Sequence, residues 1–379
     1  MYLQFLTIYH LSSFSSCIVV TMEIIIYISI IRSRAKGAQF VLPSPNHQLL
    51  KNKTIVITGG NCGIGEATVR LMYEAGAVVI MGCRDVKKGE IVCESIVRGC
   101  GGRSGGLGGT VTCLPLDLTS LPSIATFCNR LSHHLSSSYI DILICNAGIM
   151  LTPFSLTHYS MESQFGVNYF SHAALIYRLL PLLKSNPLNN SRIISVSSTA
   201  SYMLPLKTSF EMDVAQSGDH TSYNPLQAYA VSKQAQIIFM RELQQRFLRS
   251  VASTDKHPSS TDKHPSSTNT ITCFSLHPGF VGSDLFRYLP IPTFIISLAC
   301  RLLSKTPEEG CQTTIHVSTL NPILAVPGGF YADCKYIEDS RLHPKSCCVS
   351  DGEWLWRYTR DMLMVVDPTI ESFLREVDG

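Results

Sequence analysis

Two tyrosine–lysine pairs share a spacing of four residues: Tyr229 with Lys233 in "YAVSK", and Tyr331 with Lys335 in "YADCK". A free phenol has a pKa of about 10, and a nearby ammonium lowers it because the positive charge favours the phenolate. A neutral tyrosine could then protonate a carbonyl that is being reduced, and its anion could deprotonate an alcohol that is being oxidised. Such chemistry needs only one of the two pairs.

The surrounding sequence separates the two pairs. Residues 226–248 have a strongly helical pattern, so Tyr229 and Lys233 would share one helix face. Ser198 ends an earlier β-branched run, and its hydroxyl could bond the substrate oxygen that Tyr229 protonates. "YADCK" instead follows "VPGGF", where a strand with a period of two would place its tyrosine and lysine on one face but far apart. We therefore predict Tyr229 as the acid/base and Tyr331 as a packing residue of the last strand.

Short β-branched runs, separated by helix-length segments, must position these residues. This alternation predicts βαβ units and an α/β fold: a Rossmann-type, doubly wound parallel sheet in a single domain. The expected strands cover residues 54–58, 77–83, 110–118, 140–148, 192–198 and 270–279.

The ends of the chain differ from this central domain, which we place at residues 51–345. Residues 11–31 are mostly apolar and precede Arg32, Arg34 and Lys36, a pattern that predicts a membrane anchor within residues 1–36 and a cytosolic domain. An interfacial helix or a cleaved signal peptide are alternatives, and translation from Met22 would leave a segment too short to span. Residues 37–50 form a linker, and residues 346–379 a C-terminal helical extension whose tryptophans pack against the core.

Composition limits the remaining classes of function. The net charge of +3 gives no concentrated basic face, so no nucleic-acid partner is expected. The fourteen cysteines include no C-x-x-C pair, which favours reduced thiols over a metal site or disulfide scaffold. Two insertions, a glycine-rich one at 99–109 and a doubled "STDKHPS" within 253–268, predict flexible loops. We expect no metal at their histidines.

A glycine-rich segment at 58–65, "TGGNCGIG", lies between the first strand and the first helix, as a dinucleotide fingerprint requires. Gly59 would permit the tight turn, Gly63 the approach of backbone to a pyrophosphate, and Gly65 the packing of helix on strand. The predicted cofactor loop consists of Thr58, Gly59, Asn61, Gly63, Ile64 and Gly65.

The end of the second strand, "MGCRD", bears on the choice of dinucleotide. Arg84 offers a planar donor fork to a 2′-phosphate, which favours NADP(H). Asp85 could instead face a ribose hydroxyl, which leaves NAD(H) as the alternative. Cys83 takes the strand-end position itself.

Two further strand ends provide candidate cofactor contacts. Asp117 would lie beside an adenine, although a helix-cap or turn aspartate explains it equally well. Asn146, Ala147 and Gly148 end the fourth strand at the carboxyl edge, where open α/β sheets bind ligands.

Taken together, these motifs resemble the short-chain dehydrogenase/reductase family over about residues 50–340. The resemblance rests on T-G-x-x-x-G-x-G, N-A-G, "GVNYFSH" around Asn168, "RIISVSS", Y-x-x-x-K and "HPG" at 277–279, in that order. It implies that Asn168 organises a water relay to Lys233, that Ser198 (with Ser197 as runner-up) polarises the carbonyl, and that Tyr229 is the acid/base. It further implies that Lys233 binds the nicotinamide ribose, and that Tyr229, Pro278 and Gly279 complete the cofactor site.

Within that family the sequence looks most like the microsomal retinol dehydrogenases, through "CRDVKKGE", "HPGFVGSDL", "KTPEEGCQTTIH" and "GGFYADCK". The resemblance implies an NADP(H)-dependent enzyme of the endoplasmic reticulum membrane that acts on retinol/retinal or lipid-derived aldehydes, or alternatively on a sterol or isoprenoid carbonyl. The partners implied are a small hydrophobic substrate, the membrane, and a second copy of the chain paired through the helix bearing Tyr229.

Three features depart from the family pattern or leave the function open. Ser198 and Tyr229 are 31 positions apart, a longer spacing than usual, which predicts an extra loop at 199–228 beside the active site. The apolar segment 284–304 is either a lid for a lipid-soluble substrate or a core helix. A dinucleotide-binding regulatory protein without turnover is the competing class of function.

Overall fold

The structure is a computed structural model of the 379-residue chain. It describes residues 49–101, 108–135, 139–188, 190–203, 209–254, 271–281 and 304–378. The predicted anchor, most of the two insertions and nearly all of the apolar segment 284–304 lie outside the described residues. Within the described ranges, no helix combines the length and the apolar character needed to cross a bilayer.

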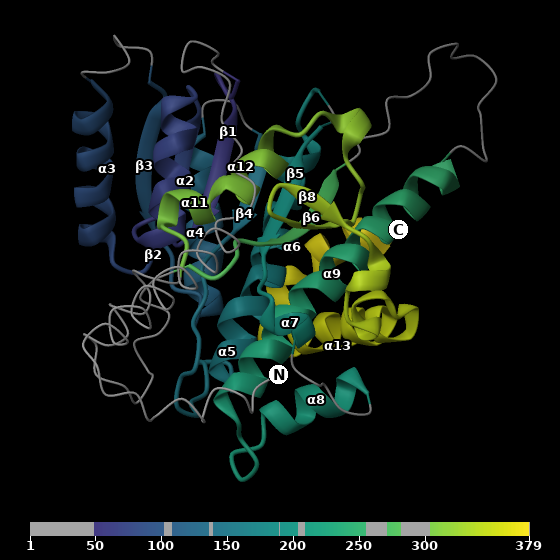
Figure 1. Ribbon diagram of the computed structural model, residues 1–379. Helices are drawn as coiled ribbons and strands as arrows, with labels where there is room; N and C mark the ends of the chain where they lie inside the picture. The colour runs from purple at the N-terminus through teal and green to yellow at the C-terminus, as the bar shows by residue number, and fades with distance from the viewer. Residues whose placement is uncertain are drawn as a thin grey trace, which may run out of the picture.

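An eight-stranded sheet forms the centre of the domain (Figure 1). Its strands are β1 (Thr54–Thr58), β2 (Val78–Cys83), β3 (Thr110–Pro115), β4 (Ile142–Cys145), β5 (Arg192–Val196), β6 (Thr272–His277), β7 (Phe330–Ala332) and β8 (Lys335–Ile337). The spatial order is β3-β2-β1-β4-β5-β6-β7-β8; β1 to β7 are parallel, and β8 runs antiparallel to β7. The parallel sheet confirms the predicted fold class, and it collects the ends of its strands at one carboxyl edge.

Helices cover both faces of the sheet (Figure 1). The longer ones are α2 (Gly63–Glu74), α3 (Val86–Gly101), α4 (Leu121–His134), α6 (Ser171–Lys184), α8 (Phe210–Ser217), α9 (Pro225–Thr254), α12 (Gln312–Thr319), α13 (Val349–Val366) and α14 (Glu371–Asp378). The described residues also form the short α5 (Ser163–Phe165), α7 (Ala200–Met203) and α11 (Pro307–Gly310). Ile55 and Ile57 of β1 belong to the core under α2, α3 and α12, while Val56 belongs to the core under α4, α6 and α9. This alternation lets one apolar strand stabilise both layers.

The C-terminal helix α13 packs along α9. Trp356 stacks on Phe239 of α9 with ring centroids 5.7 Å apart, and the Arg246 guanidinium lies 4.2 Å from the Trp356 ring centroid. The packing role predicted for the terminal tryptophans is therefore confirmed for Trp356, which is fully buried.

The second tyrosine–lysine pair lies in a hairpin. Asp333 and Cys334 have φ values of +47° and +58°, and this two-residue left-handed turn reverses the chain between β7 and β8. The expectation that Tyr331 and Lys335 share a face of one strand is wrong, because the turn places them on opposite strands, where Tyr331 pairs with Tyr336. Tyr331 is only 2% exposed, so its prediction as a packing residue is confirmed.

Candidate active site

Tyr229 and Lys233 lie on one face of α9, where they are 5% and 4% exposed. The Lys233 Nζ is 5.8 Å from the centroid of the Tyr229 ring and donates a 2.9 Å hydrogen bond to the carbonyl of Val196. Because Val196 is the last residue of β5, this bond fixes the lysine at the carboxyl edge of the sheet. The helix register predicted for the pair is confirmed.

Burial dominates the electrostatics of this pair. It raises the pKa of Tyr229 to about 12, against a smaller lowering by the hydrogen bond with the Ser198 side chain. It also lowers the pKa of Lys233 to about 7. The expectation that the ammonium pulls the phenol pKa down is wrong for this structure, because desolvation disfavours the charged form of each group. Tyr229 therefore keeps its proton at neutral pH and can serve as an acid.

The two serines after β5 have different partners. Ser197 is buried, and its hydroxyl donates a 2.7 Å hydrogen bond to the Lys233 carbonyl, so it ties α9 to β5. Ser198 is half-buried; its Oγ accepts the Ala200 N–H at 3.2 Å and its side chain is hydrogen-bonded to Tyr229. This geometry favours Ser198, the residue that the family pattern selects, as the hydroxyl beside the candidate acid.

Asn168 lies in a single π-helical turn, Gly166–Phe170, between α5 and α6. Its side-chain Nδ2 donates to the Ile149 carbonyl and to Ser232 Oγ, both at 2.9 Å, and its Oδ1 accepts the Ile149 N–H at 2.8 Å. A Cβ at Gly148 would lie 3.2 Å from Asn168 Oδ1 and 3.4 Å from Lys233 Nζ. Gly148 therefore keeps open the space between Asn168 and the lysine, while the water relay stays a prediction.

The glycine loop forms a cradle that a larger residue would fill. Gly59 has a φ of +68°, and a Cβ at Gly65 would stand 2.1 Å from the Gly59 carbonyl oxygen. The α2 helix begins directly after this loop, so its first N–H groups point toward the place where a pyrophosphate would bind. The residues thus fit a dinucleotide.

The other loop residues connect the cradle to its neighbours. Thr58 ends β1 and is fully buried, and Asn146 Nδ2 donates to the carbonyls of Thr58 and Gly59 at 2.9 and 3.2 Å. Asn61 Nδ2 makes a 3.4 Å hydrogen bond to the Asp85 carbonyl, and Ile64 packs on the core below α2. The predicted loop and the N-A-G segment therefore form one structural unit.

The end of β2 presents a cation. Cys83 is buried and its thiol is hydrogen-bonded to that of Cys113, whereas Arg84 is exposed. Asp85 Oδ1 accepts the Lys88 N–H at 3.0 Å at the start of α3, so its carboxylate stabilises the helix terminus. This contact gives the Asp85 carboxylate a structural role that does not require a bound ribose.

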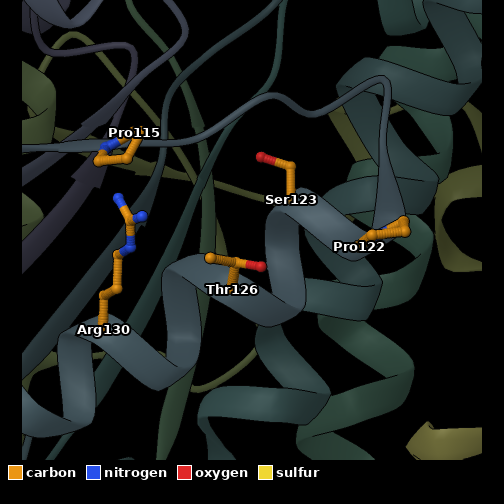
Figure 2. Close-up of a pocket in the computed structure, with 5 residues that line it drawn as sticks. All are labelled: Pro115, Pro122, Ser123, Thr126 and Arg130. Atoms are coloured by element: carbon orange, nitrogen blue, oxygen red, sulfur yellow. The ribbon is translucent and has the colours of Figure 1, made fainter.

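Asp117 shapes a turn. Its Oδ1 accepts hydrogen bonds from the Thr119 N–H and hydroxyl at 2.9 and 2.8 Å, which agrees with the turn interpretation. Close by, a cavity of about 390 Å³ opens beside α4 (Figure 2); its lining residues are Pro115, Pro122, Ser123, Thr126 and Arg130. None of these five is a predicted site residue, so this cavity does not mark the candidate active site.

A second cavity, of about 530 Å³, lies at the carboxyl edge beyond β6. Its lining residues are Tyr202, His277, Ala332, Asp333, Lys335, Tyr336, Ile337 and Arg341. Tyr202 comes from α7 in the 199–228 segment, which was predicted as a loop; its described residues include α7, α8 and the first turn of α9. Pro278 is buried after β6, and Gly279 (φ +88°) donates its N–H to His277 Nδ1 at 2.9 Å.

The sequence analysis did not single out His172, Tyr202 or His277. His172 lies one helical turn after Asn168, and that spacing is a signal that could have identified it. Tyr202 and His277 are brought together only by the tertiary fold, with 3.3 Å between the Tyr202 hydroxyl and His277 Nε2.

Comparison with known proteins agrees with this geometry. Residues 53–209 match the short chain dehydrogenase family. Retinol dehydrogenase 14 of Mus musculus is 34% identical over 325 residues, which cover 84% of this chain and 88% of the relative.

Solved structures share the fold. An uncharacterized protein from Mycobacterium paratuberculosis is 25% identical with a TM-score of 0.56, over 83% of this chain and 95% of that one. The NADP active-site complex of RhlG from Pseudomonas aeruginosa, 19% identical, has a TM-score of 0.52 over 76% of this chain and 96% of that one. The chain therefore belongs to the short-chain dehydrogenase/reductase family, in its retinol dehydrogenase-like group, and is an oxidoreductase.

Proposed function

We propose that the protein is an NADP(H)-dependent oxidoreductase that interconverts a hydrophobic alcohol and its carbonyl, retinol/retinal or a lipid-derived aldehyde being the preferred substrate. The observation that carries the proposal is the group of Ser198, Tyr229 and Lys233 at the carboxyl edge beside the glycine loop, with Tyr229 and Lys233 buried and Ser198 half-buried. The name of the Mus musculus relative and the apolar segment at 11–31 support a retinoid substrate and a membrane-bound setting in the endoplasmic reticulum.

In the proposed reaction, Ser198 and Tyr229 together hold the substrate oxygen. Burial raises the pKa of Tyr229 to about 12, so the phenol is protonated at neutral pH and its hydroxyl is available to donate to that oxygen during reduction. Lys233, held on the Val196 carbonyl, places a group with a pKa of about 7 beside the phenol. The bound nicotinamide supplies or accepts the hydride.

The preference for NADP(H) rests on the end of β2. Arg84 is exposed next to the cradle, and Lys87 and Lys88 are exposed on the first turn of α3. The hydrogen bond with the Cys113 side chain and, to a smaller extent, burial raise the pKa of Cys83, so the strand-end position that would carry an acid in an NAD site is a neutral thiol. Three exposed cations suit a 2′-phosphate.

Replacement of Arg84 tests this preference. Arg84→Ala should raise the KM for NADPH about tenfold to a hundredfold, because one charge-assisted contact contributes about 1.5–3 kcal/mol. The KM for NADH should change by less than about twofold, and Arg98→Ala, further along α3 and paired with Glu94, serves as the matched control. Equal effects on both cofactors would reject the assignment of Arg84 to the phosphate.

The substrate class needs a separate assay. Full-length protein in membranes should reduce retinal or medium-chain aldehydes with NADPH, and a panel that includes keto-steroids distinguishes the sterol alternative. No turnover of any of these with either cofactor would overturn the proposed function and favour a regulatory dinucleotide-binding protein.

A further inference from the structure

His172 connects the cofactor loop to Asn168. It lies in the first turn of α6, is buried, and has a hydrogen-bond partner at each ring nitrogen. Its Nδ1 is 2.8 Å from the carbonyl oxygen of Asn168, and its Nε2 is 2.9 Å from the hydroxyl of Thr58 at the end of β1. A single ring therefore joins two candidate site residues that lie 110 positions apart in the chain.

The partners determine the tautomer of the ring. A carbonyl oxygen can only accept, so Nδ1 must carry a proton. Burial, with a smaller effect from the Lys233 charge, lowers the pKa of His172 to about 4, so the ring is neutral and Nε2 is an acceptor. The Thr58 hydroxyl must then donate to Nε2.

The Thr58 hydroxyl is fully used in this arrangement. Besides donating to His172, its oxygen accepts the backbone N–H groups of Asn146 at 3.0 Å and of Ala147 at 2.9 Å. One donor and two acceptor positions exhaust a hydroxyl group. The chain of bonds thus joins the end of β1, the end of β4 and the first turn of α6, with every proton assigned.

On the other side, the Asn168 carbonyl is held by two side chains. It accepts from His172 Nδ1 and, also at 2.8 Å, from Gln236 Nε2 on α9, three residues after Lys233. A π-helical turn at Asn168 shifts the local backbone pairing, and such turns are frequent at functional sites. His172 and Gln236 together fix this carbonyl between the cofactor loop and the helix bearing the candidate acid.

We propose that His172 is a positioning residue: as the neutral Nδ1–H tautomer it holds Asn168 in register with the glycine loop and with Lys233. This inference rests on the proposed oxidoreductase function. In this role His172 affects turnover although it does not contact the substrate, the cofactor or the transferred proton. Loss of the ring should therefore lower kcat more than it raises the KM for either substrate.

Three substitutions separate the two halves of the contact. His172→Asn keeps a donor near the Nδ1 position but cannot reach Thr58. His172→Gln keeps a polar atom near Nε2 but leaves Gln236 Nε2 as the remaining side-chain donor to the Asn168 carbonyl. His172→Leu removes both. Because the bridge needs both contacts, we expect kcat to fall about tenfold or more for the Leu variant, which loses both, and by a smaller factor of about threefold for Asn and Gln, which each keep one. Thr58→Val combined with His172→Leu should be no worse in kcat than the poorer single variant.

A matched control addresses simple destabilisation. Tyr177→Leu alters another buried side chain of α6 and should lower the melting temperature while kcat per folded molecule stays unchanged. An unchanged kcat in His172→Leu, or an equal loss in His172→Asn and His172→Leu, would overturn the positioning role.

A spectroscopic readout is independent of activity. In ¹⁵N NMR of histidine-labelled protein, we expect a protonated, pyrrole-type Nδ1 and a bare, pyridine-type Nε2 at His172, both constant from pH 8 to pH 5.5. An Nε2–H tautomer, or titration within that range, rejects the inference even if the enzyme is active. Conversely, a wild-type protein that shows the expected tautomer but reduces no carbonyl rejects the proposed function instead.

Discussion

The two tyrosine–lysine pairs have the same spacing and opposite environments. Tyr229 and Lys233 are both buried on one face of a long helix, and each has its pKa shifted by burial. Tyr331 is buried under the last strands, but Lys335 is exposed on the far side of a two-residue turn. Spacing alone carries little information; the element in which it occurs decides whether the two groups can act together.

The largest expected contrast between the pairs is in turnover. Tyr229→Phe should lower kcat by about 10²–10⁴, because it removes the proton donor and leaves the ring packing intact. Tyr331→Phe should leave kcat within about twofold of the wild type. Steady-state reduction of retinal with NADPH measures kcat for both variants. Comparable losses of kcat would contradict the assignment of Tyr229 alone as the acid/base.

The lysines should differ in stability. Burial lowers the pKa of Lys233 from its ordinary 10.5 to about 7, so the cost of the buried ammonium is fully present below pH 7 and fades as the pH rises toward 10.5. Lys233→Met should therefore stabilise the fold by roughly 1–3 kcal/mol at pH 6, with a smaller gain at pH 10, while activity falls.

Urea unfolding at the two pH values measures this difference. Lys335→Met, on the surface, should change the free energy of unfolding by less than about 0.5 kcal/mol at both. A Lys233 variant that is less stable at pH 6 than at pH 10, relative to wild type, would contradict the assigned pKa shift.

The smallest effect concerns the hydroxyl of the hairpin tyrosine. Tyr331 accepts a 3.0 Å hydrogen bond from the Val326 N–H, so Tyr331→Phe should lower the free energy of unfolding by about 1 kcal/mol. Thermal unfolding at constant protein concentration detects a shift of this size. If Tyr331→Phe does not destabilise the fold, the hydroxyl contributes nothing to stability and only the ring of Tyr331 matters for packing.

The sheet and the glycine loop could be predicted because their signals are local. Runs such as "TIVIT" are apolar on both strand faces, and the loop glycines follow directly, so the first βα unit was predicted to within a residue or two. The reversal at Asp333 and Cys334 could not, because neither residue type demands a left-handed backbone; the pairing of β7 with β8 imposes it.

The sequence predicted which residues lie together in the candidate site better than it predicted their pKa shifts. The positions of Tyr229, Lys233 and Ser198 agree with the sequence analysis, but the sign of the Tyr229 pKa shift does not. Burial is a tertiary property, and no spacing in the sequence reports how completely α7, α8 and α13 exclude water from α9. The role of His172 was missed for the same reason, since Thr58 reaches it only in the folded sheet.

The contact between α9 and α13 has a consequence for biosynthesis. The stack of Trp356 on Phe239 covers the helix that carries Tyr229 with a residue more than a hundred positions later in the chain. A ribosome makes the C-terminal part last, so α9 exists for more than a hundred residues of synthesis without its cover. A premature stop between Thr254 and Val349 would thus leave an apolar strip of α9 open to chaperones and proteases, although every candidate catalytic residue had already been translated.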